Sequence, residues 1–477
     1  MTFYAVWNPA YVLLLMASVG LNYLVGLWIE RLRSADKTVW PVLALGIAGN
    51  LAVLGWYKYA NFFVDNYNTL TGSDFTLQKI LLPLAISFYT FQQLAYLIDV
   101  SRGEVKSGGL SRYATFVIFF PQLIAGPIVH YKEMMPQFFG RNAGRFVGSN
   151  FTIGLAIFAI GLFKKTVIAD SAAMYSTPVF NAAASGEIIP FFAAWKAALC
   201  YTVQLYFDFS GYSDMAVGLA RLFGIRLPVN FHSPLRAASI IDYWRRWHIT
   251  LQRFIVSYMH QPLAVPLTRW AAGKRLGKWS MYYVTIALPT ISVFIFIGLW
   301  HGAAWTFVTF GLLHGLYLSV NEAWRLYRRK ARKKNPPQLL DMIGYHLLTL
   351  FCVIMANVVF RAEQVGDAVK IWTGMFRISN VAQLSEIFPA SWAEVITEPL
   401  CFLLFAGALI ALFPNTQQIM GRYHPVLDWK KWKDVAHPII RLQWRLTWVW
   451  ALCTGFVLFL AVAFISRGQT EFIYFNF

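Results

Sequence analysis

The sequence predicts an all-α integral membrane protein that crosses the bilayer many times. Of its 477 residues, 58% are hydrophobic and only 13% are charged, whereas an average soluble protein is about 45–50% apolar and about 25% charged. Apolar runs long enough to cross about 30 Å of hydrocarbon as helices recur along the whole chain. The low charge and the repeated runs together nearly exclude a soluble globular enzyme.

We expect about 11–12 membrane-crossing helices. Eleven are strong, and the weaker twelfth is residues 212–225. The segment 113–129 contains Pro121 and Pro127, which break helices, so a re-entrant path is open there in place of a crossing. Because we find no internal repeat and no linker that would separate domains, residues 1–477 are expected to form one membrane domain. The eleven strong segments lie near residues 11–28, 40–57, 80–97, 113–129, 151–168, 190–207, 281–299, 303–320, 339–359, 399–413 and 446–465.

The charged residues are unevenly distributed. Lysine and arginine number 41 against 22 acidic residues, a net charge of +19; in a membrane protein this excess marks cytoplasmic loops, and a nucleic-acid partner is not expected. If the basic segments face the cytoplasm, successive spans cross the membrane in alternating directions only when residues 212–225 turn back through the membrane. The C-terminal tail, 466–477, then lies outside the cell membrane. Of these basic segments, residues 226–280 carry nine basic residues and one acidic residue. Residues 321–338 carry seven and one, and residues 414–445 carry six and two.

The sequence shows no metal site and no motif of the common soluble enzymes. Cys200, Cys352, Cys401 and Cys453 lie in apolar runs with no Cys/His spacing suited to a metal. The patterns GxSxG, HExxH, GxGxxG and the Walker A loop are absent, and no histidine has an aspartate five residues later. Hydrolase, metalloprotease, ATPase and dinucleotide-binding functions are therefore disfavoured.

The first polar cluster lies within residues 228–254, which are too polar to span a membrane and too aromatic to form a free loop. An interfacial amphipathic helix would arrange its side chains in this way. The simple interpretation is anchoring to lipid headgroups; the functional one is a mouth that attracts an anionic ligand such as a phosphorylated cofactor. The residues concerned are Asp242, Tyr243, Trp244, Arg245, Arg246, Trp247 and His248.

The second cluster lies within residues 298–315, where His301 has apolar neighbours and no carboxylate within ten residues. Desolvation favours the neutral form of a histidine, which is the form that takes a proton from a hydroxyl. His301, between Trp300 and Gly302 at an expected helix break, is therefore a candidate general base. For His314, a structural role is the preferred interpretation.

The third cluster lies within residues 204–224, an otherwise apolar stretch. Buried carboxylates need cationic partners, for which Arg221 and the arginines of the following segment are candidates. Two interpretations of these polar residues remain open: a purely structural cluster of polar side chains, and a substrate site. The polar residues are Asp208, Ser210, Ser213 and Asp214.

Five strings along the chain resemble the membrane-bound O-acyltransferase (MBOAT) family, in the order in which the family has them. The nearest branch resembles the membrane subunit of bacterial alginate O-acetylation and the teichoic-acid D-alanyl transfer protein. The strings cover most of residues 85–320, and their combination is highly specific. They are FFPQLIAGPI (119–128), GLFKKTVIAD (161–170), YFDFSGYSDMAVGLARLFGI (206–225), NFHSPLRAASIIDYWRRWHITL (230–251) and GLWHGAAW (298–305).

The resemblance implies an MBOAT fold, a ring of tilted helices around a waist with a funnel on each side and a narrow tunnel between them. His301 matches the family's near-invariant histidine and is implied to be catalytic. His248 matches a second polar position, which is histidine in this branch and asparagine in others. Asp170 matches an acidic position of the alginate branch, and Trp300 and Trp305 belong to the matching string GLWHGAAW.

Two segments bear on the acceptor of the acyl group. After RRWHITLQ (245–252) the chain reads RFIVSYMHQPLAVPL (253–267), where the alginate branch usually has a sequence like RDYLYIPLGG, so the resemblance leaves the acceptor open. The ending TEFIYFNF (470–477) resembles the aromatic C-terminus of this branch, commonly of the form FIYFQF. Its simple interpretation is a hydrophobic anchor. The sharper one makes Tyr474 a transient acyl carrier, whose phenol, of pKa about 10, attacks once a base removes its proton.

We therefore predict an O-acyltransferase of the bacterial inner membrane, surrounded by membrane lipid, with no bound cofactor and with acetyl-CoA as donor. The donor's phosphates are expected near residues 236–253, with His301 as general base and His248 orienting or polarising the donor. The acetyl group would pass to Tyr474 or to an extracytoplasmic SGNH-type acetyltransferase or esterase-like partner that modifies a polysaccharide. Supporting positions in the donor or acceptor site are Asp170, Asp208, Asp242, Arg245, Arg246, Trp247, Trp300, Trp305 and His314.

Several alternatives stay open. Alginate, cellulose, another exopolysaccharide and peptidoglycan are all possible acceptors. A transporter or channel is a rival function, because intramembrane histidines, carboxylates and glycine breaks are equally natural there. A scaffold for a polysaccharide export complex is another, and it would tolerate loss of both histidines.

Overall fold

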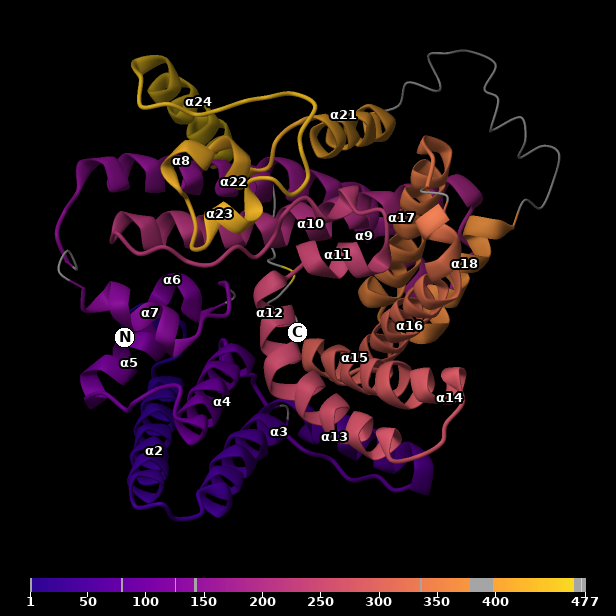
Figure 1. Ribbon diagram of the computed structural model, residues 1–477. Coiled ribbons are helices and arrows are strands. Elements are labelled where there is room, and N and C mark those ends of the chain that lie inside the picture. Colours follow the sequence, from indigo (N-terminus) through magenta and orange to yellow (C-terminus); the bar gives the residue numbers. More distant parts are fainter. Residues whose placement is uncertain are drawn as a thin grey trace, which may run out of the picture. The chain divides into compact units, whose positions relative to one another are not determined.

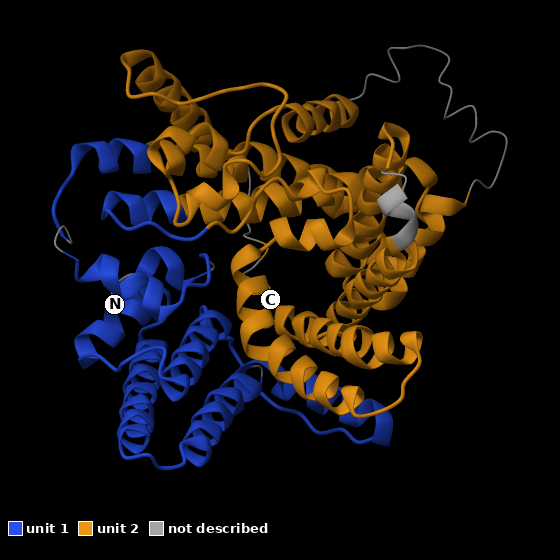
Figure 2. Ribbon diagram, viewed as in Figure 1, with its two compact units in different colours: residues 1–155, 216–228 blue, residues 156–215, 229–477 orange. Residues whose placement is uncertain are grey.

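The computed structural model describes residues 2–78, 80–124, 126–140, 144–334, 337–377, 398–466 and 473, apart from the side chains of residues 2, 3 and 330–334. Within these ranges the regular structure is helical and no β-strand occurs. The all-α prediction is therefore confirmed. The chain divides into two compact units, residues 1–155 with 216–228 and residues 156–215 with 229–477 (Figure 2).

The first unit is built on three N-terminal helices. α4 (Ile86–Arg102) is buried over nearly its whole length and contacts α2 (Pro9–Ser34) and α3 (Trp40–Thr71). Asn22 on α2 and Asn50 on α3 exchange two side-chain hydrogen bonds of 3.1 and 2.6 Å. Such a pair satisfies both amides without water, as a membrane interior requires. The remaining helices of this unit are α1 (Thr2–Trp7), α5 (Leu110–Ile118), α6 (Phe120–Leu123), α7 (Tyr131–Phe138) and the start of α8 (Gly148–Phe163) (Figure 1).

The segment 113–129, predicted as a crossing or a re-entrant path, contains a break. α5 ends at Ile118, the short α6 carries Pro121 in its first turn, and residues 126–130 are not helical. A Cβ at Gly126 would lie 2.6 Å from the Cα of Gln122, so the chain folds back closely on α6 where only glycine fits. A single crossing helix therefore does not form over these residues.

The second unit contains the polar clusters singled out in the sequence. Its closest helix pair is α15 (Leu288–His301) and α16 (Trp305–Lys334). A Cβ at Gly298 would lie 2.9 Å from the carbonyl carbon of Phe307, and one at Gly311 would lie 3.0 Å from that of Phe294. Glycine at both positions lets the two backbones touch.

The helices of the second unit follow the chain in this order: the end of α8, η1 (Lys164–Ala169), α9 (Asp170–Ala184), α10 (Phe191–Leu222), η2 (Pro234–Arg236), α11 (Ile240–Arg246), α12 (Ile249–Ile255), η3 (Val256–His260), α13 (Gln261–Ala272), α14 (Lys278–Tyr282), η4 (Tyr283–Ala287), α15, α16, α17 (Leu339–Arg361), α18 (Val365–Phe376), α21 (Glu398–Leu412), α22 (Thr416–Ile419), η5 (Gly421–Tyr423), α23 (Trp429–Trp432) and α24 (Trp448–Ile465). α8 and α10 each contribute residues to both units.

Six helical stretches are long and apolar enough to cross a membrane, among the residues that the structure describes. The other expected crossings fall on the shorter or more polar helices α4, α10, α16 and α21 and on the broken segment around α5 and α6. The chain is thus a multi-pass membrane protein. The six stretches are Pro9–Ser34, Trp40–Thr71, Gly148–Ala184, Lys278–His301, Leu339–Arg361 and Trp448–Ile465.

Two expectations about individual segments are wrong. The sequence predicts separate spans at 190–207 and 212–225, but α10 is one continuous helix of 32 residues, so no turn back occurs there. Gly211, which lies between the two predicted spans, is helical and packs on α8. A Cβ on it would lie 2.7 Å from the carbonyl oxygen of Gly161. The basic segment 321–338 is also not a loop over most of its length, because α16 continues as a helix to Lys334.

We expect Gly298→Ala to destabilise the protein, because the added methyl group forces α15 and α16 apart. Overpacking of this kind costs about 1–3 kcal/mol. The matched control is Gly344→Ala on α17, where a Cβ would meet nothing within 4 Å and alanine favours a helix by about 0.8–1 kcal/mol. Thermal unfolding in detergent measures both variants. An unchanged midpoint for Gly298→Ala would contradict the close contact.

Candidate active site

His301 is the last residue of α15 and is 5% exposed. The ring centroids of Trp300, Phe310 and Phe360 lie 4.9, 6.0 and 5.2 Å from the centroid of its imidazole. The helix ends at this point because Gly302 has an extended backbone, with φ −168° and ψ 156°. The histidine therefore stands at a helix break, as the sequence predicts, and is enclosed by aromatic rings.

His248 reaches the same aromatic cluster from a different element. It lies between α11 and α12 and is 1% exposed. Its ring centroid is 4.8 Å from that of Phe209 and 6.2 Å from that of Trp300. Since Trp300 also contacts His301, the structure brings together the two histidines that the sequence singles out. The backbone of His248 is left-handed, with φ 43° and ψ 51°, a conformation that costs a non-glycine residue about 1–3 kcal/mol and persists only where its surroundings impose it.

Asn230 holds His248 in place, and it was not singled out from the sequence although it opens one of the matching strings. Its side-chain oxygen lies 3.0 Å from Nδ1 of His248 and accepts a hydrogen bond of 2.8 Å from the hydroxyl of Thr250. Its side-chain nitrogen donates to Ser213 on α10 at 2.9 Å, and its backbone carbonyl accepts from the N–H of Ile249 at 2.9 Å. The one available signal was its place at the start of the string NFHSP.

The contact with Asn230 defines the tautomer of His248. Because the asparagine oxygen can only accept, we assign the proton to Nδ1 of His248, and Nε2 then carries the acceptor lone pair. Residues 228–254 lie outside the six candidate membrane spans, and burial lowers the pKa of His248 to about 3. His248 is therefore neutral at physiological pH.

The charged residues of α11 differ in their surroundings. Ser239 caps the helix by accepting the backbone N–H of Asp242 at 3.1 Å. Arg246 is engaged in an ion pair of 2.8 Å with Asp242, one turn earlier, whereas Arg245 is exposed. Trp247 is buried among aromatic rings. The helix thus turns aromatic side chains inward and leaves Arg245 as its exposed cation.

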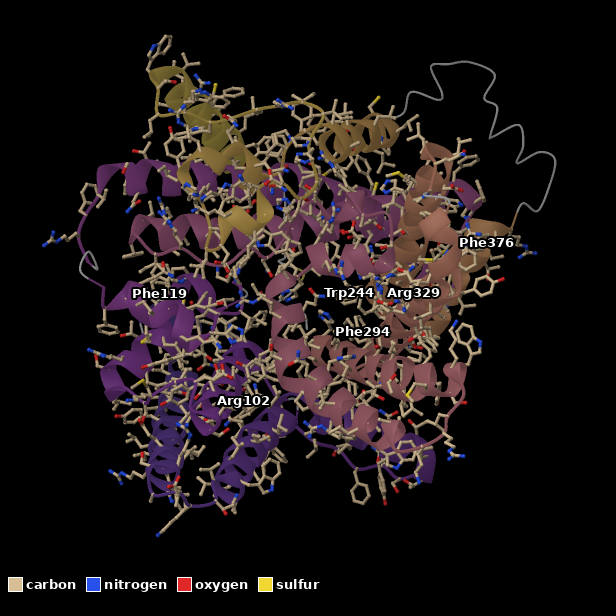
Figure 3. All side chains as sticks on the ribbon, viewed as in Figure 1. Arg102, Phe119, Trp244, Phe294, Arg329 and Phe376 are labelled. Carbon is tan, nitrogen blue, oxygen red and sulfur yellow. The ribbon has the colours of Figure 1, made fainter. Side chains whose placement is uncertain are left out.

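His314 has a partner that suits a structural role. Trp244 of α11 donates its indole N–H to Nδ1 of His314 at 3.1 Å, and both side chains are buried. Trp244 also packs edge-on against Phe294 of α15, with ring centroids 4.8 Å apart (Figure 3). These contacts join α11 to α15 and α16. Trp305, by contrast, begins α16 and is 58% exposed.

Asp170 and Asp208 share one lysine. Lys165, on the π-helical turn η1, lies 2.6 Å from Asp170 and 2.8 Å from Asp208; we call these three residues the lysine–aspartate cluster. The neighbouring Lys164 pairs with Asp214 at 2.6 Å. The arginine partners predicted for the α10 carboxylates are therefore wrong, because the close packing of α8 on α10 brings these lysines to the carboxylates first.

Tyr474 lies outside the described residues, but the residue before it is described. Ile473 is 8% exposed, and its backbone N–H donates to Oδ2 of Asp208 at 3.1 Å. The chain at Ile473 is thus held inside the second unit by the lysine–aspartate cluster.

Comparison with known proteins assigns this arrangement to a family. The family described as MBOAT, membrane-bound O-acyltransferase, matches residues 101–361, a range that contains His248, His301 and the lysine–aspartate cluster. The chain belongs to the membrane-bound O-acyltransferase family. This MBOAT protein is therefore an acyl-transferring enzyme.

Named relatives of this MBOAT protein agree with acyl transfer. A Helicobacter pylori protein named "Peptidoglycan O-acetyltransferase" is 42% identical over 406 residues, which cover 80% of this chain and 73% of the relative. A Pseudomonas putida protein named "Probable alginate O-acetylase AlgI" is 33% identical over 491 aligned positions, covering 100% and 92%. A Streptococcus thermophilus protein named "Teichoic acid D-alanyltransferase" is 26% identical over 259 residues, covering 54% and 61%. All three names describe transfer of an acyl group.

We expect His248 to contribute a loss of thermal stability as the pH falls from about 7.5 to about 5. In this range an unfolded His248, with a pKa of about 6.5, binds a proton that the folded state excludes, which costs up to about 2 kcal/mol at the acid end. Burial lowers the pKa of His232 to about 4, so it acts in the same direction. Unfolding midpoints in detergent across this range test the expectation.

The control for this pH series is His248→Asn. Asparagine tolerates the left-handed conformation and does not titrate. The midpoint should therefore depend less steeply on pH in this variant than in the parent. An equal slope in both proteins would show that His248 is not the neutral buried group.

Proposed function

We propose that this enzyme O-acetylates an extracytoplasmic polysaccharide, with acetyl-CoA as its donor. The observation that carries the proposal is that the rings of His301 and His248 both lie close to the ring of Trp300 in a membrane-bound O-acyltransferase. The relatives named for peptidoglycan and alginate O-acetylation support a polysaccharide as the final acceptor.

His301 is the general base in this proposal. The attacking hydroxyl oxygen bonds to the thioester carbonyl carbon while His301 takes the hydroxyl proton. The carbon–sulfur bond then breaks, and the departing thiolate takes that proton from the histidine. The products are one O-acetyl ester and one CoA thiol, and His301 returns to its neutral form.

His248 orients the donor. Its Nδ1 donates to Asn230, so its Nε2 offers the site an acceptor. An acceptor can hold an amide N–H of the donor's pantetheine arm, whereas stabilising an oxyanion requires a hydrogen-bond donor. Of the two roles predicted for His248, orientation is therefore favoured over polarisation of the carbonyl.

The donor and the product lie on opposite sides of the membrane in this proposal. The basic segments 226–280, 321–338 and 414–445 face the cytoplasm of a bacterial inner membrane, and the anionic end of the donor binds near Arg245, the exposed cation of α11. The tail 466–477 faces the extracytoplasmic side. The tunnel that MBOAT proteins are expected to have would join the two.

Tyr474 is the transient carrier of the acetyl group. Its phenol oxygen attacks the thioester, with His301 taking the proton, and forms an ester. A hydroxyl of an extracytoplasmic SGNH-type protein then attacks the ester carbonyl, its proton passes to the departing phenolate of Tyr474, and the acetylated protein transfers the acetyl group to a hydroxyl of the polysaccharide. The burial of Ile473 supports a tail that enters the protein.

We expect His301→Ala to lower polymer acetylation at least about 100-fold, because loss of a general base typically costs about 10²–10⁴-fold. Two measurements serve: acetyl content of the polymer in cells, and release of CoA from acetyl-CoA by purified protein. His314→Gln is the matched control, since glutamine retains an acceptor for the indole of Trp244. Normal acetylation in His301→Ala protein that reaches the membrane would refute the catalytic role.

We expect the C-terminal peptide to carry an acetyl ester on Tyr474 when the protein is isolated with donor but without its partner. Intact-peptide mass spectrometry detects the added acetyl group, and mild alkali should remove it. Tyr474→Phe removes the hydroxyl and keeps the ring, so it should lose both the ester and polymer acetylation. Full activity in Tyr474→Phe would exclude the carrier.

A further inference from the structure

We propose that the lysine–aspartate cluster is the internal docking site for the C-terminal tail, and that it recognises the tail through its backbone. The direct observation is the bond from the Ile473 N–H to Oδ2 of Asp208, 3.1 Å long. Asp208 is 1% exposed and Ile473 is 8% exposed, so the contact is shielded from water. A buried bond from a backbone amide to a carboxylate is charge-assisted and stronger than one between neutral groups.

The two oxygens of Asp208 have separate tasks. Oδ1 faces the ammonium of Lys165 at 2.8 Å, and Oδ2 takes the tail. Lys165 is also shared with Asp170 at 2.6 Å, so one formal positive charge faces two formal negative charges. The cluster is therefore poised to attract hydrogen-bond donors, and backbone N–H groups are the donors that a tail supplies whatever its side chains.

A second carboxylate on the same helix shows what a completed site looks like. Asp214 binds Lys164 and the hydroxyl of Thr416 through Oδ2, both at 2.6 Å, and the amide of Gln417 through Oδ1 at 2.7 Å. Residues of α22 thus complete the coordination of Asp214. The tail does the same for Asp208.

One acceptor of the cluster is not satisfied by a described residue. Within the described part of the chain, Oδ2 of Asp170 is buried and has no hydrogen-bond partner. Asp170 and Asp208 face the same lysine, so this oxygen belongs to the same docking site. We therefore assign the tail site two carboxylates, one already occupied by Ile473 and one open.

The docked Ile473 bears on catalysis through Tyr474, the residue that follows it in the sequence. One residue advances the chain by about 2 Å in a 3₁₀ turn, which is the conformation of Ile473, and a displacement of about 1 Å is enough to impair a reaction between bound groups. Asp208, Lys165 and Asp170 are thus positioning residues for Tyr474. This consequence for catalysis rests on the proposed carrier role of Tyr474, whereas the docking itself does not.

The test is the accessibility of the tail in the full chain. Ile473→Cys is introduced after replacing Cys200, Cys352, Cys401 and Cys453 by alanine, and its reaction with a membrane-impermeant maleimide is timed. We expect slow labelling in this parent and labelling at least about tenfold faster with Asp208→Ala. Asp208→Asn keeps an acceptor oxygen and should stay closer to the parent.

Asp214→Ala is the matched control for that experiment. Asp214 lies on the same helix and pairs with the adjacent lysine, but the tail bond runs to Asp208. Its labelling rate should equal that of the parent. Equal rates in the parent and Asp208→Ala, or an equal increase in both aspartate variants, would overturn the docking site.

A second measurement needs no aspartate variant. Hydrogen exchange on the unmodified chain should show the amide of Ile473 protected at least about 100-fold relative to an unstructured peptide, since it is buried and bonded. Exchange at the unstructured rate would overturn the proposal even if every aspartate variant failed to fold.

One further variant separates docking from the carrier role. A glycine inserted between Ile473 and Tyr474 should leave the amide protected but abolish the acetyl ester, because it lengthens the chain between the docked amide and the phenol by one residue, about 2 Å in a 3₁₀ turn. If Tyr474→Phe keeps full activity while tail labelling still depends on Asp208, the carrier fails and the docking site stands. If the ester forms but labelling does not depend on Asp208, the docking site fails and the carrier stands.

Discussion

The buried carboxylates of α10 need positively charged partners inside the protein. This requirement constrains how the helices of the second unit pack. Asp208 and Asp214 are 1% and 4% exposed, and an unpaired charge at that depth would cost several kcal/mol, of the order of 3–5 when one partner of a buried pair is removed. Adjacent lysines, Lys164 and Lys165, meet the requirement at 2.6–2.8 Å. They reach the carboxylates because Gly161 lets α8 lie directly on α10, so helix packing and charge pairing depend on each other.

The two histidines have different surroundings from these carboxylates, because the neighbours described for them are uncharged. His301 and His248 stand among aromatic rings, and Asn230 fixes His248 with a neutral hydrogen bond rather than an ion pair. A carboxylate at the position of Asn230 would favour an imidazolium, which cannot accept a proton. Among the described residues, the rings that lie against His301 belong to Trp300, Phe310 and Phe360 and carry no charge, which suits the general base proposed for His301, since a base must start each cycle unprotonated.

The sequence predicted the features that depend on composition and local pattern. The membrane class followed from missing charge, the break after Ile118 from Pro121, and the helix end at His301 from the glycine beside it. It did not predict which carboxylate meets which lysine, because that depends on the contact between α8 and α10, which no local pattern encodes. It also missed Asn230, since an asparagine in a polar stretch looks like any turn residue until its partners, drawn from distant segments, are known.

The distribution of arginines changes what the large positive charge of 226–280 means. Arg236 donates to the carbonyls of Ile410, at 2.5 Å, and Phe413 at the end of α21, where a cation stabilises the helix C-terminus. Arg246 is engaged with Asp242. Two of the cations that a charge count would assign to an anionic donor are therefore already used to hold helices in place, while Arg245 remains exposed. If the proposed anionic donor binds here, the net charge would act on it over a distance of about 10 Å, but its recognition would rest on fewer residues than the count of basic side chains implies.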